Sequence, residues 1–117
     1  MEKFMFIFEG PVSKDPQFSP DEMQAHMGLW MAWIDKLAKA GRYVEGEPLL
    51  PTGKIISGKN KVVTDAVFAE GKEIIGGYFI INAADYEEAV ALCNDYPDFE
   101  SGGSVIVRQV QKMDMPS

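Results

Sequence analysis

His26 is the only histidine of this 117-residue chain and the side chain best suited to exchange a proton near neutral pH. It lies at helical spacing, one turn before Trp30 and two turns before Trp33. An imidazole beside two indoles, at the edge of an apolar face, can serve as a general acid or base. A histidine that is simply satisfied near a helix start fits the same position, so both roles stay open.

Asp65 is the carboxylate that we consider as the partner of His26. It ends a predicted strand, and if that strand faces the helix, its carboxylate would hold the imidazole tautomer and stabilise the cation. The alternative is a turn residue that accepts hydrogen bonds from nearby backbone amides. We therefore predict His26 and Asp65 as the catalytic pair, with the structural role of Asp65 as the competing interpretation.

Other side chains could contact a small ligand because they are aromatic or charged. The tryptophans could form a wall for a planar molecule, although their spacing fits plain helix packing as well, and Phe68 fits a core position. Glu70 and Lys72 share one face of an extended segment, and Arg108 could attract an anionic group or form a structural ion pair. The predicted ligand-contacting residues are Trp30, Trp33, Phe68, Glu70, Lys72 and Arg108.

Several other kinds of site are not expected. One histidine and one cysteine, Cys93, provide no cluster with metal-ligand spacing, so we predict neither a metal nor a cofactor. Cys93 has no basic neighbour in the sequence, which favours a buried, unreactive thiol. A single cysteine cannot form an internal disulfide, and this is typical of a reducing, cytoplasmic compartment. No serine stands in a nucleophile-elbow motif.

The composition limits the partners that the chain can have. The net charge of -7 repels phosphate backbones and anionic membranes, so nucleic acid and membrane binding are not expected. The apolar run at residues 4–8 is too short to span a membrane. A length of 117 residues with 46% hydrophobic side chains suits one domain, residues 1–117, with a modest core.

Two helices are predicted from their capping residues. The first spans about 20 residues, begins after Ser19 with a capping box completed by Glu22, and ends at Gly41. The second begins after Asp85 and ends at Pro97. The apolar face predicted for the first helix consists of Met23, Met27, Trp30, Ile34 and Leu37.

The strand pattern predicts the fold class and an oligomer. Strands are expected at residues 3–9, 54–58, 61–65, 73–82 and 104–110, and a short strand or extended segment is expected at residues 42–51, with a tight hairpin turn at Lys59-Asn60 and a kink at Gly76-Gly77. This order predicts an α+β fold with two helices on one face of an antiparallel sheet. Residues 4–8, 78–81 and 105–107 are apolar on both faces, so the face without helices would expose a contiguous patch. We predict a homodimer in which two such faces meet.

The segment TDAVFAEGKEIIGGYFII at residues 64–81, with GEPLLP at 46–51 and GGSVIVRQV at 102–110, resembles the YCII-related family. The likeness covers most of the chain and is strongest to the DGPF-domain branch, although Ala66-Val67 replaces the Gly-Pro of its signature. The resemblance implies a ferredoxin-like α+β fold that forms a dimeric α+β barrel, and a histidine paired with an aspartate. The matching positions are Asp65, Phe68, Ala69, Glu70, Lys72, Glu73, Gly76 and Gly77.

Two classes of function fit these features. The first is a cofactor-free enzyme of the isomerase or lyase type, in which His26 and Asp65 move protons on a small, partly aromatic acid or lactone. The second is a non-catalytic dimeric module that binds a small metabolite or serves an accessory role, and a scaffold without a pocket is a plainer third. A carboxylate within hydrogen-bond reach of His26, beside a cavity, favours the enzyme.

Overall fold

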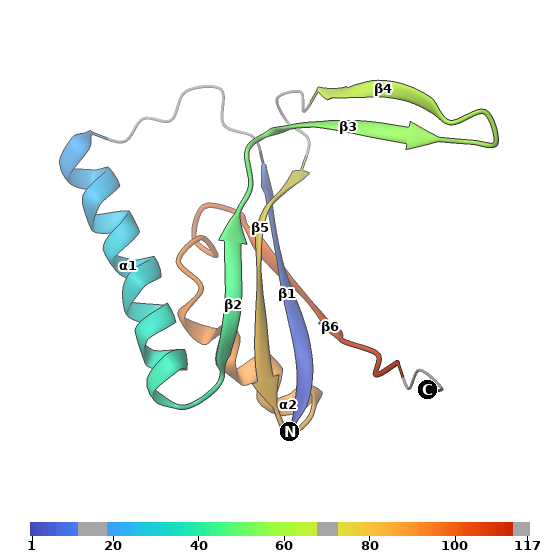
Figure 1. Cartoon of the computed structure of the whole chain (residues 1–117). Coiled ribbons are helices and arrows are strands. Elements are labelled where there is room, and N and C mark those ends of the chain that lie inside the picture. Colours follow the sequence, from blue (N-terminus) through green and yellow to red (C-terminus); the bar gives the residue numbers. More distant parts are fainter. Residues whose placement is uncertain (12–18, 68–72, 114–117) are drawn as a thin grey trace.

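The structure, a computed structural model, describes residues 1–11, 19–67 and 73–113 (Figure 1). Four strands form an antiparallel sheet in the order β2-β5-β1-β6, and β3 and β4 pair as a separate hairpin. This arrangement confirms the predicted ferredoxin-like α+β fold, with the hairpin inserted between its second and third strands. The elements are β1 (Glu2–Pro11), α1 (Pro20–Lys39), β2 (Tyr43–Pro48), β3 (Thr52–Ser57), β4 (Val62–Val67), β5 (Glu73–Ala83), α2 (Tyr86–Ala91), the 3-10 helix η1 (Leu92–Asp95) and β6 (Ser104–Gln109).

Both helices begin at the predicted caps. The Glu22 amide donates to Ser19 Oγ at 3.2 Å, and the Glu88 amide donates to Asp85 Oδ1 at 2.9 Å. Glu88 reaches back in turn, because its Oε1 accepts a hydrogen bond from the Ala84 amide at 3.0 Å. Amides that the helices themselves leave without partners are thereby satisfied, and the starting points of both helices are fixed.

The buried face of α1 agrees with the predicted one in part, because Leu37 is buried and Trp30 and Ile34 pack against the core. Trp33 and Leu37, one turn apart, are 1% and 2% exposed, whereas Met23 and Met27 are 42% and 58% exposed. Trp33 is the largest side chain that the core encloses, and its ring lies parallel to that of Phe6 at 6.1 Å. Because this indole occupies the space above the sheet, the helix turns its two methionines toward solvent. No helix among the described residues is both long and apolar enough to cross a membrane.

The core fills the space between the two helices and one face of the sheet. Strand β1 contributes Phe4, Phe6 and Phe8 to it, and these rings contact aromatic rings from both helical segments. Phe4 meets Tyr86 of α2, and Phe8 meets Tyr96, which follows η1. Both helices therefore cover the same face, as predicted, and the last turn of the second helix tightens into η1 before Pro97.

The glycine pair in β5 forms the predicted bulge. Phe8 pairs with Gly77 and Glu9 with Ile75, which leaves Gly76 as an extra residue on β5. A Cβ atom on Gly77 would lie 2.9 Å from the Glu47 carbonyl oxygen, so a side chain there would push β2 away. Glycine at this position allows the close approach of β2 and β5 at the end of the sheet where the hairpin begins.

On the opposite side of the sheet, the described part of the chain places no helix. Strand register places five apolar side chains there, which we call the open face: Met5, Ile7, Tyr78, Ile80 and Ile106. Ile7 pairs with both Tyr78 and Ile106, and Ile106 is 38% exposed. The two-sided apolar character of the strands is therefore real, while the homodimer inferred from it stays a prediction.

The hairpin of β3 and β4, which we call the arm, extends past the end of the four-stranded sheet (Figure 1). Every residue of β3 is exposed. The turn lies where the sequence predicts it, but it uses four residues, with Gly58 at φ 79° and Lys61 at φ 55°. Asn60 is flanked by lysines at this tip, so the tip is polar and basic.

Candidate functional site

His26 lies on the core side of α1, where it meets the segment that follows η1. Its side chain is 23% exposed, and its Nε2 atom lies 3.1 Å from Oδ1 of Asp98. One helical turn further along, the Trp30 indole N–H donates a hydrogen bond to the same Nε2 at 3.3 Å. The imidazole is thus held between an indole from its own helix and a carboxylate from a distant part of the chain.

The two partners of Nε2 require different protonation states. An indole N–H can donate only when Nε2 carries a lone pair, whereas the Asp98 carboxylate can accept only when Nε2 carries a proton. A single nitrogen cannot satisfy both at once. Which of the two contacts is a hydrogen bond at a given moment therefore depends on whether Nε2 carries the proton.

Asp98 is fixed in place by a turn. Its carbonyl oxygen accepts hydrogen bonds from the amides of Ser101 at 3.2 Å and Gly103 at 2.9 Å. Its side chain is 30% exposed, and Pro97 directly before it prevents η1 from continuing. These bonds fix the backbone of Asp98 independently of His26.

Aromatic rings line the same region. Tyr96 stacks on Phe8 at 5.4 Å and meets Trp30 edge-on at 5.6 Å, and Phe99 packs edge-on against Tyr96 at 4.8 Å. Burial, together with the nearby Asp98 carboxylate, raises the pKa of Tyr96 to about 12. Its hydroxyl therefore stays protonated at neutral pH and can donate a hydrogen bond but cannot act as a base.

Asp65 lies elsewhere. It is in β4 and forms an exposed ion pair with Lys54, its cross-strand neighbour in β3. The structure thus does not bring the predicted His26–Asp65 pair together, and Asp98 occupies the place expected for Asp65. The physical reason is that the arm leaves the sheet instead of folding back toward α1 (Figure 1).

The predicted ligand-contacting residues are dispersed. Trp30 touches His26, whereas Trp33 takes the packing role, since it is 1% exposed and its indole N–H donates to the Leu92 carbonyl at 3.0 Å. Arg108 pairs in register with Met5, so it lies on the open face, across the sheet from His26. Three more of these predictions, Phe68, Glu70 and Lys72, lie outside the described residues.

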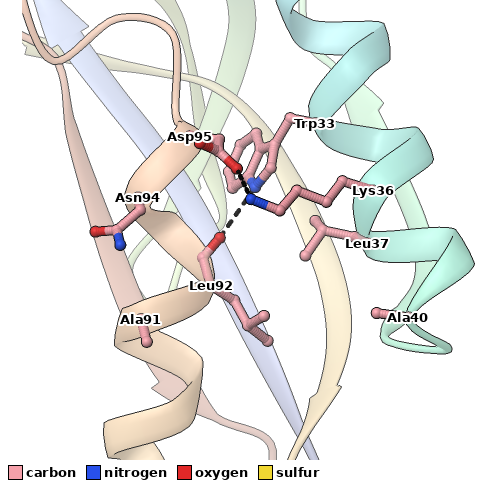
Figure 2. Close-up of a pocket in the computed structure, with 8 residues that line it drawn as sticks. All are labelled: Trp33, Lys36, Leu37, Ala40, Ala91, Leu92, Asn94 and Asp95. Atoms are coloured by element: carbon pink, nitrogen blue, oxygen red, sulfur yellow. Dashed lines mark hydrogen bonds and ion pairs between the residues drawn. The ribbon is translucent and has the colours of Figure 1, made fainter.

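A small pocket of about 120 Å³ lies between α1 and η1 (Figure 2). Lys36 and Asp95 form an ion pair of 2.8 Å across it. His26 does not line it, and the volume is below the roughly 300 Å³ of a typical ligand pocket. In the described part of the chain, no group of three or more His, Cys, Asp or Glu side chains is placed to hold a metal ion. The pocket is lined by Trp33, Lys36, Leu37, Ala40, Ala91, Leu92, Asn94 and Asp95.

Sequence reasoning missed Asp98 and did not assign Tyr96 to the site. A signal for both was present, because Tyr96, Pro97 and Asp98 are consecutive at the predicted end of the second helix. Pro97 stops the helix, so the next side chain must leave its axis at the edge of the core. A carboxylate at such a point is a natural partner for a histidine on the neighbouring helix.

The comparison with known protein families agrees with this architecture. The model of the YCII-related domain matches residues 6–114, which is nearly the whole chain. No curated protein matches the chain significantly. With its ferredoxin-like sheet, its inserted hairpin and a family match of this extent, the chain belongs to the YCII-related domain family.

Proposed function

We propose that this protein is a cofactor-free enzyme of the isomerase or lyase type, in which His26 moves a proton on a small, partly aromatic acid or lactone. The observation that carries the proposal is the 3.1 Å contact between His26 Nε2 and Asp98 Oδ1 in a half-buried, aromatic setting. Asp98 replaces Asp65 as the proposed partner, because its carboxylate is within reach of the imidazole whereas Asp65 pairs with Lys54.

The proposed chemistry follows from the tautomers of His26. When Nε2–H donates to Asp98, the lone pair lies on Nδ1, and that nitrogen accepts the proton from the substrate carbon. The resulting imidazolium is stabilised by the Asp98 carboxylate, which stays ionised. The proton returns to a second carbon in an isomerase or to the leaving group in a lyase. The rings of Trp30 and Phe99 offer apolar surface for a planar substrate.

We also propose that the protein acts as a homodimer in which the open faces meet. A folded monomer of 13.0 kDa is expected to expose about 6,300 Å², but this chain exposes 8749 Å², an excess of roughly 2,400 Å². Stable homodimers bury about 1,000–2,500 Å² per subunit, so the excess is of the size that one partner would cover. The apolar side chains of the open face give that contact its driving force.

The test combines a ligand screen with isotope exchange. Aromatic acids and lactones are screened by thermal shift, and the ligands that bind are incubated with the protein in D₂O. We expect deuterium incorporation by the wild type, and a rate about 10²–10⁴-fold lower for His26→Gln and Asp98→Asn. The matched control, Asp65→Asn, should exchange like the wild type. Undiminished exchange by His26→Gln would overturn the proposal.

The non-catalytic alternative has one observation in its favour. The pocket between α1 and η1 is bounded by the Lys36–Asp95 ion pair and does not include His26 (Figure 2). A module that only binds a metabolite there would be stabilised equally by the ligand with and without His26. Equal thermal shifts for wild type and His26→Gln, with no deuterium incorporation by either, would favour this function over the enzyme.

A further inference from the structure

We propose that the arm of one subunit packs along the β2 edge of the open face of a second copy of the chain, with the basic tip of the arm against the acidic residues of that edge. The inference rests on the proposed homodimer and goes beyond it, because it assigns the surface that the arm covers. It does not depend on the proposed enzymatic activity.

The arm stands outside the body of its own subunit. The radius of gyration is 16.6 Å, whereas a compact domain of 117 residues has about 13 Å. The molecule measures 47 × 43 × 20 Å, and its short dimension fits one sheet covered by one layer of helices. The arm therefore lengthens the molecule instead of thickening it, as Figure 1 also shows.

Both faces of the arm carry apolar side chains. Ile56 stands opposite Val63 on one face, and the other face carries Ile55 and Val62. These four side chains are 53–66% exposed. An isolated two-stranded hairpin is at best marginally stable in water, and exposed branched side chains on both of its faces call for a covering surface.

The charge of the arm identifies the kind of surface. Residues 52–67 contain three lysines and one aspartate, in a chain whose net charge is -7. The acidic counterpart lies on β2, where register places Glu45 beside Ile80 and Glu47 beside Tyr78, and both glutamates are exposed. A second copy thus offers an apolar floor whose rim is acidic along β2, and this matches an apolar hairpin whose tip carries Lys59 and Lys61.

Two-fold symmetry explains why a second copy suits both surfaces better than an unrelated partner. In a symmetric pair whose open faces meet, each arm packs along the β2 edge of the other subunit's open face, so two exposed apolar surfaces disappear in one interface. The excess of roughly 2,400 Å² over the surface of a compact monomer is large enough to include an arm in addition to a direct contact between sheets. Two copies of the chain can therefore cover the arm and the open face without a third molecule.

Photo-crosslinking with isotope labels tests this arrangement. Ile56→Cys is labelled with a benzophenone maleimide, which the buried Cys93 does not take up in the folded protein. Equal amounts of ¹⁴N and ¹⁵N chains are mixed, irradiated and digested. We expect crosslinked peptides that join a light and a heavy chain, with the target in β2 or β5. The matched control is Ala38→Cys on the exposed side of α1, which should give no such light–heavy products.

The possible outcomes distinguish a failure of the proposed arm contact from a failure of the proposed dimer. Crosslinks confined to chains of one isotope, in a protein that sediments as a dimer, would overturn the arm contact and leave the dimer intact. Sedimentation as a monomer would overturn both. The charge contribution is tested by Lys59→Glu combined with Lys61→Glu, which should raise the dimer dissociation constant by about tenfold or more. An unchanged dissociation constant would contradict the assigned acidic rim.

Discussion

A single methyl group added at Gly103 should disturb the His26 site without replacing any residue in it. A Cβ atom on Gly103 would lie 2.5 Å from Tyr96 Oη and 3.0 Å from the Asp98 carbonyl oxygen. Gly103 is not among the glycines with a positive φ, so the cost of Gly103→Ala is steric and not conformational. The strain falls on the turn that holds Asp98 within 3.1 Å of His26.

The expected loss of stability in Gly103→Ala follows from these short contacts. Overpacking of a tightly packed site costs about 1–3 kcal/mol, so Gly103→Ala should lower the free energy of unfolding by that amount in urea titrations. Displacement of Asp98 should also slow deuterium exchange about 10–100-fold, because proton transfer depends on the position of the partner to within an ångström. Protein concentration must be held constant, since association changes the apparent stability.

Gly28→Ala is the matched control for Gly103→Ala. Gly28 lies within α1, and a Cβ atom there meets nothing within 4 Å. Alanine should therefore stabilise the protein by about 0.5–1 kcal/mol through helix propensity alone. If Gly103→Ala were as stable and as active as the wild type, the reasoning that places Asp98 through this turn would be refuted.

Three further predictions concern pH, a helix cap and the arm. Burial raises the pKa of Cys93 and of Tyr96 to about 12, so their contribution to stability is complete below their ordinary values of 9.0 and 10.0 and is lost as pH rises from there toward about 12. Over this pH range each group lowers the free energy of unfolding by at most about 1.4 kcal/mol per pH unit. A urea midpoint that does not change with pH over the same range would contradict the raised pKa values of the two groups. Ser19→Ala should cost about 1 kcal/mol of stability in the same titration, and no loss would show that the cap is dispensable. Asp65→Asn, which breaks an exposed ion pair with Lys54, should change stability by less than about 1 kcal/mol, and a larger loss would indicate a buried partner.

Features governed by neighbouring residues could be predicted from the sequence. The caps at Ser19 and Asp85 follow from side chains three residues apart, and the bulge follows from the Gly76-Gly77 pair. The ferredoxin-like order follows from the alternation of strand and helix patterns. Each of these depends on a short stretch of chain, so no knowledge of distant contacts is needed.

Features that depend on distant contacts could not be predicted in the same way. Helical spacing gave an apolar stripe on α1 but not its rotation, which is set by the size of Trp33 and the shape of the sheet below it. The partner of His26 is 72 residues away in the chain, and the choice between Asp65 and Asp98 depends on the direction in which the arm leaves the sheet. That direction is not encoded in residue periodicity.

The pairing of His26 with Asp98 can be measured without a known substrate. Because the chain has one histidine, a long-range ¹⁵N–¹H NMR spectrum contains the signals of a single imidazole. Replacement of the Asp98 carboxylate by Asp98→Asn should move both ring nitrogen signals of His26, and Asp65→Asn should leave them where they are. Signals that respond to Asp65→Asn and ignore Asp98→Asn would contradict the site described above.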